Sequence, residues 1–285
     1  MLPHIPTSPW LRTLYAAYIG AFFLYLALPL AVVSAFAFND SNFPALPWQG
    51  FTLDWFIGNA APRIGVFNDG AILKAIGTSA LVSVWVAGLA VLVATTNAFL
   101  FERYAFPLKS VLYVVMLLPL VVPGIILGIS ILVFSSRIAN FAQGELGLRI
   151  NALRPGLPLV VLGQFSFIAT MATLVISARL RKFDRSLEEA ALNLGATPWQ
   201  AIRHVTLPYL MPAMVAAGLV SILMSFENFN TTLMLVGSDA PLTVTMFDRL
   251  KQGSTPVLNA VSLLLMAASS LLALLVILFQ RGARR

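Results

Sequence analysis

Long apolar stretches constrain this chain more than any other feature of its sequence. A helix needs about 20 apolar residues to cross the hydrocarbon core of a bilayer, and about six runs of that order are present. Helices are expected because each one satisfies its backbone hydrogen bonds internally, whereas a membrane β-barrel needs an alternating pattern that these runs lack. The sequence therefore predicts an all-α membrane protein. Its spans cover residues 14–38, 75–101, 108–134, 159–178, 209–236 and 257–280.

The composition excludes several classes of protein. Only 10% of the residues are charged, against roughly 25% in soluble domains. The net charge of +7 is spread between the apolar runs with no long basic tract, so we expect no nucleic-acid partner. There is no cysteine, and the two histidines, His4 and His204, lie far apart in the sequence. We therefore expect no disulfide, no thiol chemistry and no metal site.

The basic residues predict the orientation of the spans. If the N-terminus is cytoplasmic, eleven of the 18 Lys and Arg residues fall in cytoplasmic segments and seven in outer ones. Both termini are then cytoplasmic. Arg12, the first apolar run and Ala35-Phe36-Ala37 also resemble a cleavable signal peptide. Because the run exceeds the roughly 7–15 residues of a signal core, we expect a retained helix.

We expect the chain to divide near residue 74. Residues 1–74 would form a first helix followed by a long outer segment rich in proline, glycine and aromatic residues. Residues 75–285 would form the helical core, with a polar cytoplasmic loop at 179–208. The third run contains Pro119, Pro123, Gly124 and Gly128. These residues are compatible with kinks and close packing, or with a broken helix that lines a pathway.

The polar loop carries two helix-start signals. Ser186 followed by Glu189 forms a capping box, so a helix should begin at Leu187, with Gly195 as its left-handed C-terminal cap. Thr197 with Gln200 forms a second box, with Pro198 at the first helical position. This second helix should end near Val205, before Pro208.

Such short helices are marginal alone in water and need a surface to pack on. Leu187, Ala190, Ala191 and Leu194 form an apolar stripe at helical spacing. Glu188 and Glu189 could offer charges to a basic partner. The pattern leaves two partners open: the chain's own helices, or another subunit.

The loop also carries a recognisable motif. Glu189-Ala190-Ala191, three residues, Gly195, nine residues and Val205-Thr206-Leu207-Pro208 resemble the EAA loop of permease subunits in binding-protein-dependent ABC importers. Val205 stands where isoleucine is usual, which is a conservative change. The resemblance extends from about the second span to the C-terminus.

This resemblance implies a type I importer permease bundle (MetI-like) in a bacterial inner membrane. The loop would insert into a groove on a cytoplasmic ATP-binding subunit, which binds ATP and Mg. The other implied partners are a second permease subunit in a heterodimer, an extracytoplasmic solute-binding protein and membrane lipid. The chain itself would hold no cofactor and no catalytic residue, since it has no phosphate-binding loop of the G-x-x-x-x-G-K-[ST] type. The residues that would contact or position the ATPase are Glu188, Glu189, Ala190, Ala191, Gly195, Leu207 and Pro208.

Glu227 is the residue that bears on the cargo. It lies within the fifth apolar run, where a charge costs about 2.5–3.5 kcal/mol or more and usually faces a cavity or a partner. It can be a structural carboxylate or a group that attracts cations on the pathway. The chain resembles the spermidine/putrescine permeases at Ser225-Phe226-Glu227, Phe229, Gly237, Pro241-Leu242-Thr243-Val244, Pro256 and Asn259-Ala260. This resemblance implies a polyamine or a related cation as the cargo. Phe226 and Phe229 could offer ring faces to its ammonium group. Asn228 departs from that branch, which often has a second acid there.

The cargo could instead be a phosphonate, an opine or an amino-acid-like solute, since those permeases share much of this pattern. Two other classes of protein fit less well. An ion-coupled secondary transporter would need acids in several spans, and only Glu227 qualifies. A membrane enzyme would need a cluster of catalytic groups, and the sequence offers none.

Overall fold

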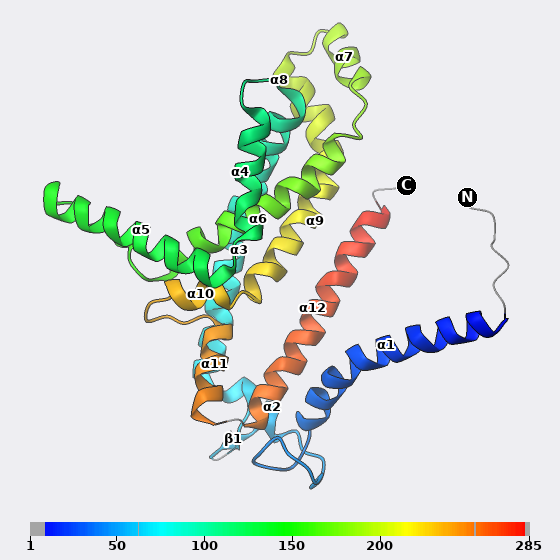
Figure 1. Cartoon of the computed structure of the whole chain (residues 1–285), viewed down its shortest axis with the longest axis vertical. Helices are drawn as coiled ribbons and strands as arrows, with labels where there is room; N and C mark the ends of the chain where they lie inside the picture. Colours follow the sequence, from blue (N-terminus) through cyan, green and yellow to red (C-terminus); the bar gives the residue numbers. More distant parts are fainter. Residues whose placement is uncertain (1–8, 62, 254, 283–285) are drawn as a thin grey trace. The chain divides into compact units, whose positions relative to one another are not determined.

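The computed structural model describes residues 9–61, 63–253 and 255–282, and most of these are helical (Figure 1). Within them, six helices are long and apolar enough to cross a membrane. The predicted all-α membrane class is therefore confirmed. The six are α1 (Pro9–Phe36), α3 (Gly70–Arg103), α5 (Gly124–Glu145), α6 (Leu157–Leu180), the continuous helix Pro198–Phe226, and α12 (Pro256–Gly282).

Two of the predicted spans have the wrong boundaries. The run 108–134 is not one helix, because α4 (Lys109–Val121) ends and α5 begins at Gly124. Val122 between them is extended, with ψ 129°, as expected for a residue that precedes a proline. The run 209–236 is also broken, since its long helix ends at Phe226 and the short α10 (Asn230–Leu235) follows.

Contacts within the chain divide it into two compact units. The first unit is built from the residues up to Gly70 together with Arg249–Ala267. The second is built from Ala71–Asp248 together with the residues from Ala268 on. Each unit has its own set of packed side chains and is described separately below.

The first unit contains α1 and a small polar cap. No residue of α1 is buried against the described chain. The cap holds α2 (Asp54–Ile57), the antiparallel strands β1 (Asn59–Ala60) and β2 (Arg63–Ile64), and the 3-10 turn η1 (Val66–Asn68).

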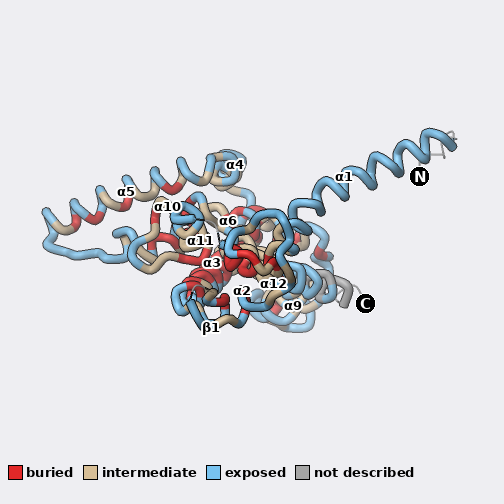
Figure 2. The backbone as a smooth tube through the Cα atoms, turned by 90° about the horizontal axis from the view of Figure 1, so that it is seen from below, coloured by how far each residue is buried: buried red, intermediate tan, exposed pale blue. Residues whose placement is uncertain are grey.

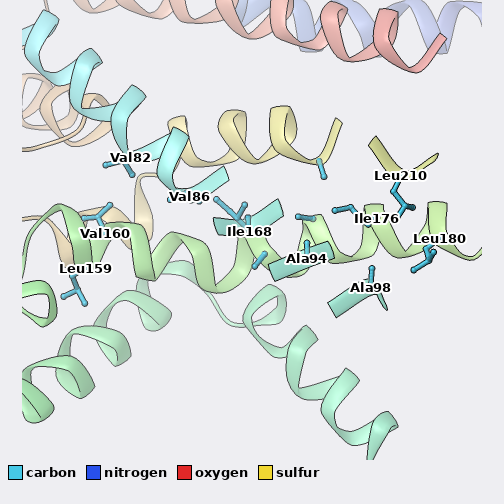
Figure 3. Packing of buried hydrophobic residues seen from close by; sticks show 14 of the residues in the cluster. Val82, Val86, Ala94, Ala98, Leu159, Val160, Ile168, Ile176, Leu180 and Leu210 are labelled. Atoms are coloured by element: carbon cyan, nitrogen blue, oxygen red, sulfur yellow. The ribbon is translucent and has the colours of Figure 1, made fainter. Parts of the chain in front are cut away.

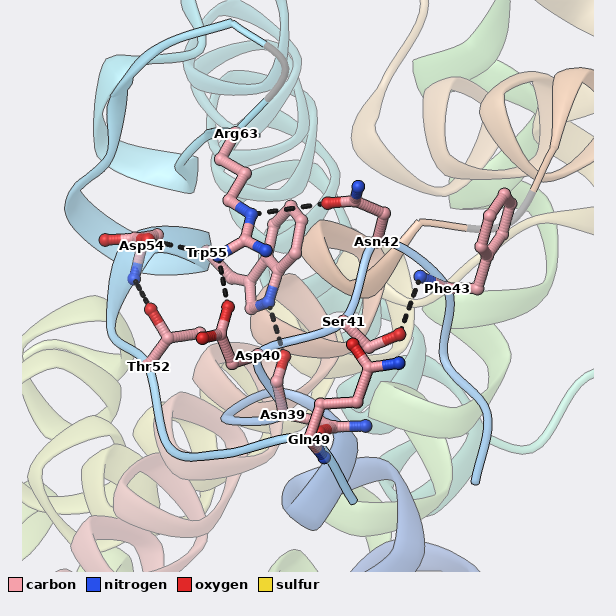
Figure 4. Close-up of polar contacts among 10 residues, drawn as sticks. All are labelled: Asn39, Asp40, Ser41, Asn42, Phe43, Gln49, Thr52, Asp54, Trp55 and Arg63. Carbon is pink, nitrogen blue, oxygen red and sulfur yellow. Dashed lines mark hydrogen bonds and ion pairs between the residues drawn. The ribbon is translucent and has the colours of Figure 1, made fainter. Parts of the chain in front are cut away.

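The cap is organised around Trp55 and Arg63 (Figure 4). The buried indole of Trp55 donates from Nε1 to the backbone oxygen of Asn39 at 2.8 Å. The guanidinium of Arg63 lies 5.4 Å from the centre of the Trp55 ring, pairs with Asp40 and donates to Asn42 at 3.2 Å. Arg63 thus joins β2 to the segment that follows α1.

The second unit has its core where α3, α6 and α9 (Leu207–Phe226) run together (Figures 2 and 3). On α3 the buried positions recur at helical spacing, and between Ala75 and Ala98 they are all Ala, Ser, Thr or Val, which lets neighbouring helix backbones approach closely. The larger side chains of α6 fill the remaining space. The core includes Val82, Val86, Ala90, Ala94, Ala98, Ile168, Ile176 and Leu210.

Glycines set the contact between α5 and α10. A Cβ built on Gly128 would lie 2.9 Å from Cβ of Met234 and 3.1 Å from the backbone oxygen of Thr231. At Gly124 it would lie 3.1 Å from Cβ of Asn230. Of the two roles left open for these glycines, close packing is the one that the contacts display.

Candidate functional site

The first candidate site is the polar loop between α6 and α9, which lies at one end of these helices (Figure 1). It contains α7 (Ser186–Asn193), α8 (Pro198–Ala201) and the π-helical turn η3 (Ile202–Thr206). The expected order of helix, glycine turn and helix is present.

Gly195 ends α7 as predicted, with φ +90°. The Gly195 N–H donates to the Leu192 oxygen at 3.0 Å, and the Ala196 N–H donates to the Ala191 oxygen at 3.1 Å. These two bonds form a Schellman motif, which satisfies the last carbonyls of the helix. The positive φ favours glycine because an L side chain is strained there.

The start of α7 differs from the prediction. Ser186 was expected to be the N-cap, but it is the first residue of the helix and no capping box with Glu189 forms. Instead, Oδ1 of Asp184 accepts a hydrogen bond from the Ser186 N–H at 3.0 Å. That backbone hydrogen bond lowers the pKa of Asp184. An aspartate two residues upstream therefore does what the serine was expected to do.

The second capping box is confirmed. The Gln200 N–H donates to Oγ1 of Thr197 at 3.3 Å, and the Thr197 N–H donates to Oε1 of Gln200 at 2.8 Å. Pro198 lies at the first helical turn, where its missing N–H costs nothing.

The predicted break before Pro208 is wrong. The helix runs from α8 through η3 into α9 without interruption. In a regular helix the Pro208 ring would clash with the carbonyl four residues earlier. The wider π turn, in which the Leu207 N–H bonds the Ile202 oxygen, provides the extra room.

The residues of the EAA motif fall on two faces of the loop. Glu189 and Ala190 are exposed, as is the neighbouring Leu187 at 51%. Ala191 and Leu207 are half-buried, and Pro208 is exposed. Leu194, next to Gly195, is 90% exposed. The outer face is thus largely apolar and carries the exposed carboxylate of Glu189.

Glu188 does not share the outer face with Glu189. Its carboxylate turns inward and pairs with Arg103, the last residue of α3, at 2.9 Å. It also accepts a hydrogen bond from the hydroxyl of Thr206 in η3. The two adjacent glutamates therefore face opposite sides, although the sequence grouped them together.

The second candidate site is the break between α9 and α10. Glu227 follows the last residue of α9 and is exposed, so its carboxylate lies at a helix end and not within a continuous span. Phe226 is half-buried beside it. The ring of Phe229 packs against Phe247, with 4.8 Å between centroids, so this ring is partly occupied by a neighbour.

Asn228 stabilises the break itself. Its Oδ1 accepts from the backbone N–H of Thr232 at 3.2 Å and from the Thr232 hydroxyl at 3.0 Å. Its backbone oxygen accepts from the hydroxyl of Thr243 at 3.1 Å. The position that departs from the polyamine branch thus satisfies an N–H in the first turn of α10 from just before that helix begins.

A buried polar group that the sequence analysis missed supports the same break. Gln164, on α6 and 1% exposed, donates from Nε2 to the Thr232 hydroxyl at 2.7 Å. Its Oε1 accepts a hydrogen bond from the Ser225 hydroxyl. Buried amides need such partners, so Gln164 fixes the end of α9 to the start of α10. The signal in the sequence was a glutamine inside an otherwise apolar run.

Comparison with known proteins gives a consistent picture. The sequence profile of the family described as binding-protein-dependent transport system inner membrane component matches residues 94–284. The putrescine transport system permease protein PotI of Escherichia coli K12 is 28% identical over 263 residues, which cover 92% of this chain and 87% of PotI. The spermidine/putrescine permease PotC of the same strain is 26% identical, covering 90% of each chain.

Two further relatives widen the comparison. A 2-aminoethylphosphonate transport system permease, PhnV of Salmonella paratyphi A, is 31% identical and covers 86% of this chain and 88% of PhnV. A chain of a bacterial ABC transporter for the acidic polysaccharide alginate has the same fold, with a TM-score of 0.68 at 20% identity, covering 97% of this chain and 96% of that one. The predicted importer-permease fold is confirmed by this likeness.

The family profile covers well over half of the chain and includes the loop and the break described above. The chain therefore belongs to the family of inner-membrane components of binding-protein-dependent transport systems, as a multi-pass ABC permease subunit of a bacterial inner membrane.

Proposed function

We propose that the loop between α6 and α9 inserts into a cytoplasmic ATPase and that this permease imports a small amine-containing solute. The observation that carries the first part is the outer face of α7. Within the polar loop, the apolar side chains of Leu187 and Ala190 on α7, and of Leu194 at its end, are exposed. Exposed apolar groups of this kind mark an interaction site. Glu189 beside them supplies a charge for a basic group on the partner.

The transport cycle follows from differential binding. A loop can transmit ATP binding only if it contacts the ATPase differently in the two states of the bundle. The Schellman motif at Gly195 and the capping box at Thr197 make the loop rigid. A displacement of the loop by the ATPase is therefore passed on to α6 and α9. ATP and Mg belong to the ATPase, and this chain supplies the docking surface and the pathway.

The remaining partners and the orientation are part of the same proposal. With the loop in the cytoplasm, the alternation of spans places both termini there as well. A second, different permease subunit completes the pathway, and a solute-binding protein delivers the cargo from outside. A structure of the related alginate transporter was solved with a pentasaccharide-bound periplasmic protein, which supports this arrangement.

The names of the similar permeases share one chemical group. Putrescine, spermidine and 2-aminoethylphosphonate all carry an aliphatic primary amine, which is a cation at neutral pH. Glu227 places an exposed carboxylate at the C-terminal end of α9, where the helix dipole adds negative potential. This combination favours an ammonium group at the break between α9 and α10.

Replacing Glu227 by glutamine should lower the initial rate of putrescine uptake about tenfold. The substitution keeps the shape of the side chain and removes one charge, and tenfold corresponds to about 1.4 kcal/mol. Uptake of labelled putrescine is measured in cells that lack other polyamine transporters, with the amount of membrane-inserted chain held equal.

Glu145 provides the matched control, because it is an exposed glutamate at the end of α5. Glu145→Gln should leave uptake within twofold of the unaltered chain. Equal losses in the two variants would contradict a role for Glu227 in recognising the amine. Uptake of 2-aminoethylphosphonate without putrescine would assign the cargo to the phosphonate branch and keep the amine as the recognised group. Uptake of amine-free anions alone would contradict the proposal.

A further inference from the structure

Three separate elements meet at one half-buried carboxylate oxygen. Oε1 of Glu188, on α7, accepts from Nη2 of Arg103 at 2.9 Å and from the hydroxyl of Thr206. The side chains of Arg103 and Glu188 are only 14% and 20% exposed. A charge withdrawn from water to this extent is costly unless it is paired, so the pair strongly favours a single geometry.

An aromatic ring also packs against Arg103. Its guanidinium carbon lies 5.3 Å from the centre of the Phe183 ring, which is 7% exposed. The Phe183 ring meets that of Tyr209, on α9, edge to face at 5.1 Å. A second guanidinium, that of Arg179, lies 4.1 Å from the Tyr209 ring centre. The end of α3 thus packs against Phe183, in the segment that leads into the loop, and Phe183 in turn packs against Tyr209 in the helix that leaves it.

The preceding residue of α3, Glu102, forms a second ion pair with the start of the loop, in which the acid lies on α3 and the base on the loop. Glu102 accepts from Arg181 at 2.8 Å, which raises the pKa of Arg181, and its backbone oxygen accepts from Arg185 at 3.1 Å. The Arg181 side chain is 58% exposed. Its partner Glu102 is 15% exposed, so this pair has one member in water, whereas both members of the Glu188 pair are withdrawn from it. Exposed charges contribute little, so the pair at Glu188 carries most of the attachment.

We infer that Glu188 is a positioning residue that makes α3 move together with the loop. This inference rests on the proposed docking of the loop to an ATPase. Without the pair, α7 is joined to the bundle mainly through the chain on either side of it, because the other contacts of the α3 end, with Arg181, Phe183 and Arg185, are to residues that precede α7. With it, a third core helix receives the same displacement as α6 and α9. The adjacent glutamates then have separate tasks: Glu189 faces the partner, and Glu188 fixes the loop to α3.

The absence of cysteine from the chain makes a direct test practical. Cysteines at Tyr104 and Leu194, which are 62% and 90% exposed, carry spin labels just beyond α3 and at the end of α7. Their distance is measured by pulsed electron paramagnetic resonance in the whole transporter, whose other subunits have been freed of reactive cysteine. The nucleotide-free and vanadate-trapped states are compared.

With the Arg103–Glu188 pair intact, the two spin labels should give one narrow distance distribution that is the same in both states. Glu188→Ala should at least double the width of the distribution and shift it between the states. ATPase activity stimulated by the solute-binding protein should fall about tenfold in this variant. The control Arg181→Met should leave both measurements within twofold, because it removes an arginine that is 58% exposed and makes no ion pair or hydrogen bond with α7 in the described residues.

The charge swap Arg103→Glu with Glu188→Arg separates positioning from simple folding. It should restore the narrow distance and at least half of the stimulated ATPase activity, and it decides the matter if the single variant does not assemble. An unchanged distance in Glu188→Ala, equal broadening in Arg181→Met, or a swap without rescue would each overturn the inference. If no ATPase subunit co-purifies with the unaltered chain, the proposed function is overturned, and the inference with it.

Discussion

Replacing Gly195 by valine should reduce solute uptake tenfold or more while the chain remains in the membrane. The backbone of Gly195 has φ +90°, and a Cβ there would meet no atom within 4 Å. The penalty is therefore conformational and not a clash. An L residue whose backbone adopts the left-handed conformation costs roughly 1–2 kcal/mol. A β-branched residue such as valine is a marked outlier there. The eight residues of α7 provide little stability to absorb that cost.

Uptake and the amount of inserted chain are measured together for this variant. Asparagine is the matched control, since it tolerates a left-handed backbone better than other side chains. Gly195→Asn should keep at least a third of the uptake. Because Gly195 is exposed, a side chain there disturbs no core packing. Normal uptake in the valine variant would show that the shape of this turn is irrelevant to transport.

Replacing Gly128 by leucine should lower both stability and uptake. A side chain at this position would push against Cβ of Met234 and the backbone oxygen of Thr231, neither of which is the flexible end of a side chain. Overpacking of this kind costs about 1–3 kcal/mol, occasionally more. The helix displaced is α10, which begins just after the break that holds Glu227. We therefore expect a lower thermal midpoint in detergent and at least a tenfold loss of uptake.

Gly144 provides the control on the same helix. A Cβ at Gly144 would meet no atom within 4 Å, so Gly144→Leu should change neither the midpoint by more than about 2 °C nor the uptake by more than twofold. If Gly128→Leu behaved like Gly144→Leu, the close contact between α5 and α10 would have no role in stability or transport.

Local chemistry made parts of the loop predictable from the sequence. Gly195 and the Thr197 capping box depend on residues within a few positions of each other, and both were found as expected. The capping box at Ser186 did not form, because Asp184 accepts the Ser186 N–H that Glu189 would have accepted. Two candidate caps so close together cannot be ranked from sequence spacing alone. The helix at Pro208 continued because a π turn relieved the clash, an alternative that composition does not signal.

Contacts between distant parts of the chain were beyond the sequence. Arg103 lies 85 residues before Glu188, and no pattern within the loop indicates that this glutamate faces inward. Gln164 reaches Thr232 across 68 residues. The break at Pro123 was visible as a proline followed by glycine, yet the apolar run continued across it and hid the boundary between two helices. Hydropathy shows how long an apolar run is, but it does not show whether one continuous helix spans that run.

The most direct measurement of the central claim is a cross-link from the tip of the loop. A single cysteine at Leu194, the only thiol in this chain, is treated with a short bifunctional maleimide in the assembled transporter. The account predicts a cross-link to the ATPase subunit, and protection of the cysteine from a membrane-impermeant reagent added outside intact cells. A cysteine at Leu148, which is 56% exposed in the segment between α5 and α6, should show the reverse on both counts. Labelling of the Leu194 cysteine from outside, or a cross-link only within the chain itself, would contradict the account.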